Sequence, residues 1–254
     1  MMTIFDPAEG GPPNPAHDDI YLVEFPRSGI TWLSFILGNI ELRLAGANEF
    51  VTYYNHHRHV VDVHQLRGDG RINRRLGRTF IKSHSTYNPD YYFVVYLVRN
   101  PIDVMVSYYN FMRHEQDYRE SFDHFVRHPL FGVGKWKEHV NSWLYAKDEH
   151  QRLHLLRYED LVRDVQRVIS DLYMNLGVAL EEVLLRDALE RSSLESMKHS
   201  EEHYRRSNPR VCATYVGKER KIPRSDLLTD DVMAFIIGET VEELRAFYPD
   251  LLPG

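Results

Sequence analysis

The sequence predicts one α/β domain in which a central, mainly parallel sheet is flanked by helices. Short apolar runs alternate with longer segments of helical periodicity, which is the pattern of strand–loop–helix units. The run at 91–98, YYFVVYLV, is apolar throughout, as in a central parallel strand covered on both faces. The 254 residues suffice for one large core, and neither a repeat nor an internal linker divides them.

The expected elements follow the apolar pattern along the chain. A short apolar run predicts a buried strand, and apolar residues three or four apart predict a helix. Asn100 and Pro101 supply a helix start, and Gly177 supplies a stop. Strands are expected at 20–25, 79–82, 91–98 and 153–156. Helices are expected at 31–44, from 100 onward, at 161–176 and at 229–247.

Composition and charge exclude several classes of protein. The net charge of −6 argues against a nucleic-acid partner, whose binding surface would make the domain basic. The one cysteine, Cys212, excludes an internal disulfide framework and a zinc site built from several cysteines. No apolar run approaches the roughly 20 residues of a membrane span, and the first residues do not resemble a secretory signal. We expect a cytoplasmic protein with a flexible lead-in at 1–19 and its domain at 20–254.

The loop between the first strand and the first helix is a candidate phosphate site. It reads Phe25-Pro26-Arg27-Ser28-Gly29-Ile30-Thr31-Trp32. Backbone N–H groups and the helix dipole converge on an anion at such a junction, and Gly29 permits close approach of the backbone. The alternative is a tight turn capped by a Ser or Thr. The loop lacks the Gly-Lys pair of the Walker pattern, which disfavours an ordinary P-loop nucleotidase.

A second candidate phosphate site follows the long apolar strand. Arg99 ends that strand, and Ser107 lies two turns into the next helix. The two side chains are able to face one phosphate group. The alternative is an arginine that covers the sheet edge beside a surface serine.

Four segments match one known family in order and spacing over about residues 20–220. FPRSGITWL resembles the 5′-phosphosulfate loop, usually PKSGTTWL, of sulfotransferases that use 3′-phosphoadenosine-5′-phosphosulfate (PAPS). FIKSHSTY resembles the KTH segment, which carries the catalytic histidine in the cytosolic enzymes. YLVRNPIDVMVSYYNF resembles the 3′-phosphate motif, and LLRYEDLVRD resembles the YEDL segment. The late stretch SLESMKHSE is also similar to the family's.

The resemblance implies a P-loop-like sulfotransferase fold and a role for each matching residue. Arg99 and Ser107 are expected to hold the 3′-phosphate, and Tyr158 to contact the adenine. His84 corresponds to the general base and Lys82 to a neighbouring cation. The expected product is 3′,5′-adenosine bisphosphate (PAP). No metal is expected, because Arg27 and Lys82 can supply the same charge. The 5′-phosphosulfate is expected to be held by Arg27, Ser28, Gly29, Ile30, Thr31 and Trp32, with Trp32 also near the adenine.

Two departures from the family pattern affect the donor site. Arg27 stands where the family usually has lysine, and arginine stabilises charge but does not donate a proton at ordinary pH. The late RKGxxGDWK motif is degraded to the stretch 215–221, YVGKERK, which has no tryptophan. Gly217 and Lys218 are the expected cofactor contacts there.

The expected reaction is an in-line transfer whose catalysis is mostly positioning and charge stabilisation. His84 suits the role of base because an ordinary histidine titrates near pH 6.5, and a positioned base contributes about 10²–10⁴ in rate. Arg27, with Lys82, is expected to stabilise the charge on the leaving phosphate oxygen. Arginines and lysines at 67–82 and 205–224 either focus an anionic ligand into the site or form a solvated face.

The acceptor side is less defined. The stretch 51–59, VTYYNHHRH, either lines an acceptor pocket or forms an exposed polar loop. Its polar character favours a small-molecule or carbohydrate acceptor, such as a glycan or a glycosylated or hydroxylated metabolite, over a flat phenol or steroid. The acceptor's identity and the oligomeric state, a homodimer included, stay open.

Two other functions stay open as alternatives. A phosphotransferase of the nucleotide-kinase type would need Mg²⁺ and a Walker lysine. A non-catalytic protein that binds a 3′-phosphoadenosine nucleotide would need Arg99 and Ser107 but neither His84 nor Arg27.

Overall fold

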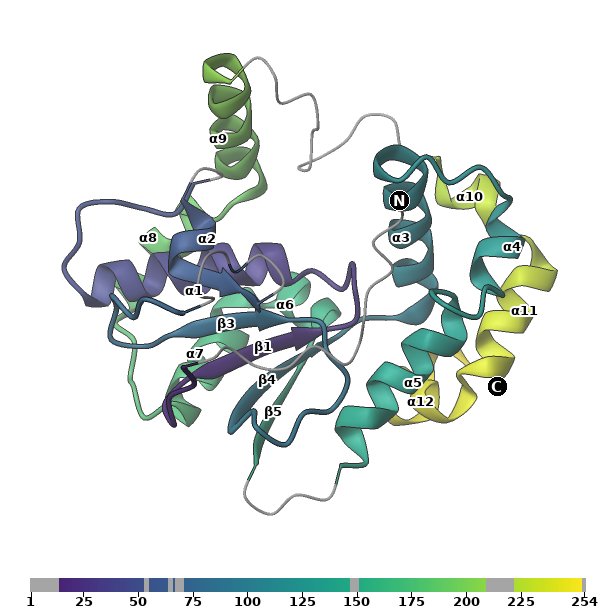
Figure 1. The fold of residues 1–254 in the computed structure, drawn as a ribbon, viewed down its shortest axis with the longest axis horizontal. Helices are drawn as coiled ribbons and strands as arrows, with labels where there is room; N and C mark the ends of the chain where they lie inside the picture. Colours follow the sequence, from purple (N-terminus) through teal and green to yellow (C-terminus); the bar gives the residue numbers. More distant parts are fainter. Residues whose placement is uncertain are drawn as a thin grey trace.

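Within the residues that the structure describes, five parallel strands form one sheet in the order β2-β3-β1-β4-β5 (Figure 1). The computed structural model describes residues 14–52, 55–63, 66, 71–146, 151–208 and 222–252. The strands are β1 (Ile20–Glu24), β2 (Val60–Asp62), β3 (Phe80–Ser83), β4 (Phe93–Val98) and β5 (Arg152–Arg157). Their carboxyl ends meet at one edge, where ligands of such sheets bind. The predicted α/β fold is confirmed, and so is the interior, buried parallel strand at 91–98, which is β4 and lies between β1 and β5.

β1 is buried along its whole length because its side chains alternate between two hydrophobic layers. Ile20 and Leu22 pack against helices on one face, whereas Tyr21 and Val23 pack against helices on the other. Glu24 is the last residue of β1, and the alternation turns its side chain toward the same face as Leu22. A carboxyl group therefore lies at the end of the middle strand.

Helices cover both faces of the sheet (Figure 1). The layer on the Leu22 face contains α1 (Ile30–Leu44), α6 (Tyr158–Arg163), α7 (Val165–Asn175) and α8 (Glu182–Arg191). The layer on the Tyr21 face contains α3 (Pro101–Glu115), α4 (Phe122–Val126), α5 (Val133–Leu144), α11 (Asp230–Glu239) and α12 (Val241–Phe247). The other described helices are α2 (His56–His59), α9 (Leu194–Ser207), α10 (Arg224–Leu227) and a short 3-10 helix at Pro249–Leu251.

Two helices that the sequence predicts as continuous are each divided in two. Asp164 separates α6 from α7, and its carboxylate caps α7 by accepting the N–H of Arg167. Thr240 separates α11 from α12, and its hydroxyl donates to the carbonyl of Ile236. The predicted start of α3 is confirmed, because the Asn100 side chain accepts the N–H of Ile102 at 2.9 Å.

Residues 14–19 contact the segment around residue 72. Asn14 exchanges two hydrogen bonds with the main chain of Ile72, and the buried Asp19 binds the guanidinium of Arg74. The division of the chain into 1–19 and 20–254 stays a prediction. In the described part of the chain, no helix has both the length and the hydropathy needed to cross a membrane.

Candidate active site

The loop between β1 and α1 turns sharply at two residues with positive φ. Arg27 has a φ of 76° and Gly29 a φ of 118°, a region that favours glycine and strains arginine. Ser28 between them is buried, and its hydroxyl donates to the carbonyl of Phe25 at 2.8 Å. Strain of this kind gathers at ligand-binding loops. The predicted phosphosulfate loop is thus a fixed turn at the N-terminus of α1, where anions bind.

The aromatic ring of Tyr158 lies directly against this turn. A Cβ placed on Gly29 would approach two ring carbons of Tyr158 to 2.5 Å, so only glycine fits there. Tyr158 is the first residue of α6 and follows β5 directly. The loop that follows β1 therefore contacts Tyr158, which follows the edge strand β5. The predicted adenine contact requires Tyr158 to lie near this loop.

Replacing Gly29 with Ala is expected to disrupt the donor loop. The positive φ costs about 1–3 kcal/mol for a residue with a Cβ, and the new methyl group displaces the Tyr158 ring. We expect a lower melting temperature and loss of PAP binding in a calorimetric titration. Gly46→Ala is the matched control, because Gly46 also has a positive φ but no atom within 4 Å of the added Cβ. Unchanged PAP binding by Gly29→Ala would remove this loop from the donor site.

Arg99 connects the two predicted phosphate sites. Its guanidinium donates to the carbonyl of Arg27 at 3.2 Å and lies 4.3 Å from the centre of the Tyr158 ring. Burial lowers the pKa of Arg27, and the nearby Glu24 opposes that shift. Ser107 is half-buried in α3, which begins two residues after Arg99.

Two buried guanidinium atoms give a direct test of whether the site fits an anion. The Nε atoms of Arg27 and Arg99 are buried and have no hydrogen-bond partner among the described residues. A buried donor without a partner is costly, and a phosphate or sulfate oxygen would satisfy it. Arg157, at the end of β5, shares this feature, but its guanidinium lies over the Tyr248 ring and 3.8 Å from Asp160.

The start of α1 offers fewer donors than the resemblance implies. Ile30 is buried and has no polar side chain, and its N–H is donated to the carboxylate of Glu24 at 2.7 Å. Thr31 is exposed. Trp32 is half-buried, its indole N–H binds the carbonyl of Ser192 at 3.0 Å, and its ring meets Tyr158 edge-on.

The predicted base, His84, follows β3 directly. Its Nδ1 lies 3.2 Å from the backbone carbonyl of Glu24. A carbonyl only accepts, so the imidazole donates to it through a proton on Nδ1. The ring is 14% exposed, which leaves it within reach of a bound acceptor. The hydrogen bond orients the ring, and its exposure gives access, both of which the predicted role as general base requires.

The main chain of His84 is held from α5. The His84 carbonyl accepts the Nε2 proton of His139 at 3.0 Å, so His139 Nδ1 accepts from the Tyr96 hydroxyl at 2.9 Å. Burial lowers the pKa of His139 to about 4, so it stays neutral in this network. The indole of Trp143 donates to the carbonyl of Ser85 at 2.9 Å. Nothing in the sequence singled out His139 among 14 histidines.

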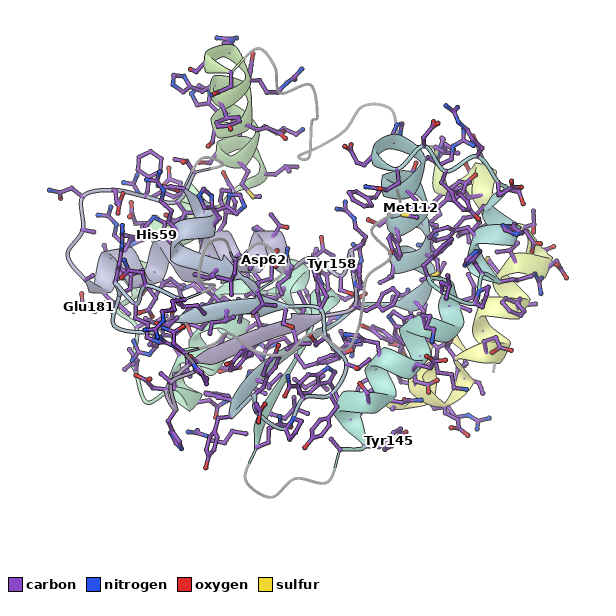
Figure 2. The ribbon with its side chains drawn as sticks, viewed as in Figure 1. His59, Asp62, Met112, Tyr145, Tyr158 and Glu181 are labelled. Carbon is purple, nitrogen blue, oxygen red and sulfur yellow. The ribbon has the colours of Figure 1, made fainter. Side chains whose placement is uncertain are left out.

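Lys82 lies near His84 and is paired with a carboxylate. Its Nζ is 3.2 Å from Asp62, which ends β2. Asp62 is the last residue of β2, and Tyr158 directly follows β5. Figure 2 shows both residues at the carboxyl edge of the sheet. The pair provides one donor and one acceptor beside the predicted base.

Glu24 is a residue of the candidate site that the sequence did not predict. Its carboxyl lies 4.0 Å from His84 Nδ1 and is under the electrostatic influence of Lys82, Arg27 and Arg99. It therefore joins the predicted base to the predicted phosphate loop. The available signal was a charged residue at the end of the apolar run IYLVEF, directly before the loop.

Some predicted features lie elsewhere or outside the described residues. Gly217 and Lys218 fall outside them, as do Tyr53 and Tyr54 of the expected acceptor stretch. In the basic stretch at 67–82, Arg74 and Arg78 pair with the buried carboxylates of Asp19 and Glu41. These two arginines support the fold rather than focus a ligand.

The comparison with protein families decides the family. The family model of a sulfotransferase domain matches residues 17–211. The chain belongs to the sulfotransferase family. Sulfotransferase 1C2 of Oryctolagus cuniculus is 30% identical over 199 residues, which cover 71% of this chain and 66% of that protein. Human sulfotransferase 2A1 is 28% identical over 196 residues, which cover 72% of this chain and 67% of that protein.

Solved structures of sulfotransferases and related proteins share the fold. Retinol dehydratase in a complex with retinol and PAP has a TM-score of 0.66 at 19% identity, over 91% of this chain and 82% of that chain. Mouse SULT7A1 complexed with PAP has a TM-score of 0.64 at 18% identity, over 92% and 86%. The predicted family, α/β sulfotransferase fold and enzyme class are confirmed, and this chain is a sulfotransferase. It spans about two thirds of the length of the curated relatives it matches.

Proposed function

We propose that this sulfotransferase moves a sulfuryl group from PAPS to an acceptor hydroxyl and releases PAP. The observation that carries the proposal is the meeting of Arg27, Arg99 and His84 around Glu24 at the carboxyl edge of the sheet. Guanidinium groups with buried, unpartnered Nε atoms suit a ligand with several phosphate or sulfate oxygens. The PAP in the sulfotransferase neighbours agrees with this donor.

The donor nucleotide would be held from two sides. The loop at 25–32 is assigned to the phosphosulfate, and Arg99 with Ser107 to the 3′-phosphate. Tyr158, whose ring lies against Gly29 and beneath the Arg99 guanidinium, is assigned to the adenine, as the resemblance of its segment implies. The donor supplies the activated sulfuryl group, and the chain supplies position and charge.

His84 is assigned the proton transfer. Its Nδ1–H is held by the Glu24 carbonyl, which directs the Nε2 lone pair toward the proton of the acceptor hydroxyl. Arg27 provides fixed positive charge for the oxygen that gains charge as the sulfuryl group leaves, and Lys82 adds to it. The hydrogen bonds from His139 and Trp143 keep the base in place, so little reorganisation is needed.

The acceptor proposed is a glycan, or a glycosylated or hydroxylated metabolite. Lys82 and Asp62 support this class, because an ammonium donor and a carboxylate acceptor side by side suit the hydroxyls of a sugar. Retinol dehydratase, by contrast, is known in complexes with retinol and androsterone. The resemblance of the His84 segment to cytosolic enzymes supports a cytoplasmic reaction.

The test is transfer of labelled sulfate from PAPS to a panel of sugars, glycosides, phenols and steroids, without added metal. We expect label on sugar or glycoside hydroxyls. If only phenols or steroids were labelled, the acceptor would belong to that class and the proposed sugar or glycoside acceptor would be wrong. PAP binding without transfer to any acceptor would favour the non-catalytic alternative, and Mg²⁺-dependent ATP turnover the kinase-type alternative.

A further inference from the structure

The Glu24 side chain occupies a position that an anion would be expected to take. It is 3% exposed, and its Oε2 accepts the N–H of Ile30, the first residue of α1, at 2.7 Å. Backbone N–H groups at the start of a helix that follows such a loop are the donors that hold phosphates. One oxygen of the Glu24 carboxylate thus uses a donor of the predicted phosphosulfate loop.

The surroundings of this carboxylate are strongly basic. The charged and titratable groups that face it are Arg27 in the loop, Lys82 in β3, His84 after β3, Tyr96 in β4 and Arg99 after β4. Lys82 is shared with the carboxylate of Asp62, and burial keeps Tyr96 neutral by raising its pKa. The same cations are assigned to the donor nucleotide, so Glu24 and that nucleotide depend on the same charges.

We propose that Glu24 is a built-in competitor of the donor nucleotide, occupying the phosphosulfate loop as a carboxylate and taking up a proton when the nucleotide binds. The inference rests on the proposed donor. It assigns Glu24 to the control of donor affinity, a role distinct from the roles of His84 and Arg27.

The direction of the pH dependence follows from charge. Burial raises the pKa of Glu24 to about 7, and Lys82, Arg27 and Arg99 oppose that rise. A bound nucleotide brings further negative charge and takes over these cations, which raises the pKa of Glu24 again. A group whose pKa rises on binding takes up protons, so affinity is highest below pH 7 and falls as the pH rises.

Measurement at pH 8 separates Glu24 from other proton sources. The phosphates of free PAP have a second pKa of about 6 and are fully ionised there. A pKa of about 7 leaves Glu24 about nine-tenths ionised at pH 8, so nearly one proton can be taken up. His84 is tested directly with His84→Gln.

The experiment is calorimetric titration of the whole chain with PAP at pH 8 in HEPES and in Tris, which differ in ionisation enthalpy. We expect the native chain to take up about half a proton to one proton per PAP bound. Glu24→Gln keeps an oxygen for the Ile30 N–H but removes the charge, so its uptake should fall close to zero. His84→Gln should retain the uptake.

The affinity itself gives a second readout. Between pH 7 and pH 8.5 the dissociation constant of the native chain for PAP should rise about tenfold, whereas that of Glu24→Gln should stay flat. Glu41→Gln is the matched control. Glu41 in α1 is a buried glutamate like Glu24, but its carboxylate pairs with Arg78 and Tyr173. This variant should behave like the native chain.

Four results would overturn the inference. If the native chain took up no proton on binding PAP at pH 8, the inference would be wrong, and no variant would be needed to show it. Uptake that persists in Glu24→Gln, or disappears in His84→Gln, would assign the proton to another group. No PAP binding by the native chain at any pH would overturn the proposed donor, whereas PAP binding independent of pH and of Glu24 would overturn this inference alone.

Discussion

Replacing His84 with Gln is expected to lower kcat for sulfuryl transfer by about 10²–10⁴-fold, the usual contribution of a positioned general base. Glutamine keeps a donor for the Glu24 carbonyl but has no basic lone pair for the acceptor proton. PAP binding should stay within a few-fold of the native value, because the phosphate ligands are unchanged. Steady-state kinetics together with a PAP titration measure the two quantities separately.

A matched histidine controls for nonspecific effects of this change. His154 in β5 is half-buried and hydrogen-bonded to Asn175, away from the donor loop. His154→Gln should leave kcat nearly unchanged. A kcat for His84→Gln within a few-fold of the native value would show that another group, or water, accepts the proton.

Replacing Arg99 with Ala is expected to abolish the preference for a 3′-phosphate. Loss of a half-buried charged partner costs about 2–4 kcal/mol, which corresponds to a PAP affinity about 30- to 1,000-fold lower. The affinity for 5′-AMP, which lacks the 3′-phosphate, should change much less. Titration of both nucleotides against both chains gives the coupling between Arg99 and that phosphate.

One further variant separates charge from packing at Arg99, and a second serves as a control. Arg99→Lys keeps the charge but loses the forked donors and the stacking on Tyr158, so an intermediate loss is expected. Arg152→Ala removes an arginine that stacks on Phe93 at the opposite end of β5, and should not affect either nucleotide. Equal losses for PAP and 5′-AMP in Arg99→Ala would mean that Arg99 supports the loop rather than the 3′-phosphate.

The sequence was most informative where local signals are strong. The apolar strands, the Asn100-Pro101 helix start and the loop at 25–29 each follow from neighbouring residues, and the structure has them. The breaks at Asp164 and Thr240 were missed because polar residues inside a helical period are common and do not by themselves end a helix. β2 has three residues and α2 four, too few for either period to be visible.

The sequence predicted which segments form the candidate site, but not the hydrogen bonds and charge interactions that connect them. Arg27, Arg99 and Tyr158 do meet in space, as motif order implied. The role of Glu24 depends on cations from three separate segments, and that of His139 on a partner 55 residues away. Contacts of this range leave no periodic trace, so the sequence shows at most that Glu24 is a charged residue at the end of an apolar run, and nothing marks His139.

The two halves of the site depend on opposite faces of the sheet. The proposed donor loop leads into α1, which packs on the Leu22 face, whereas the main chain at His84 and Ser85 is held by α5, on the Tyr21 face. Neither layer alone can hold both the proposed nucleotide site and the proposed base. We therefore expect that partial opening of either helix layer would inactivate the enzyme before the sheet itself unfolds.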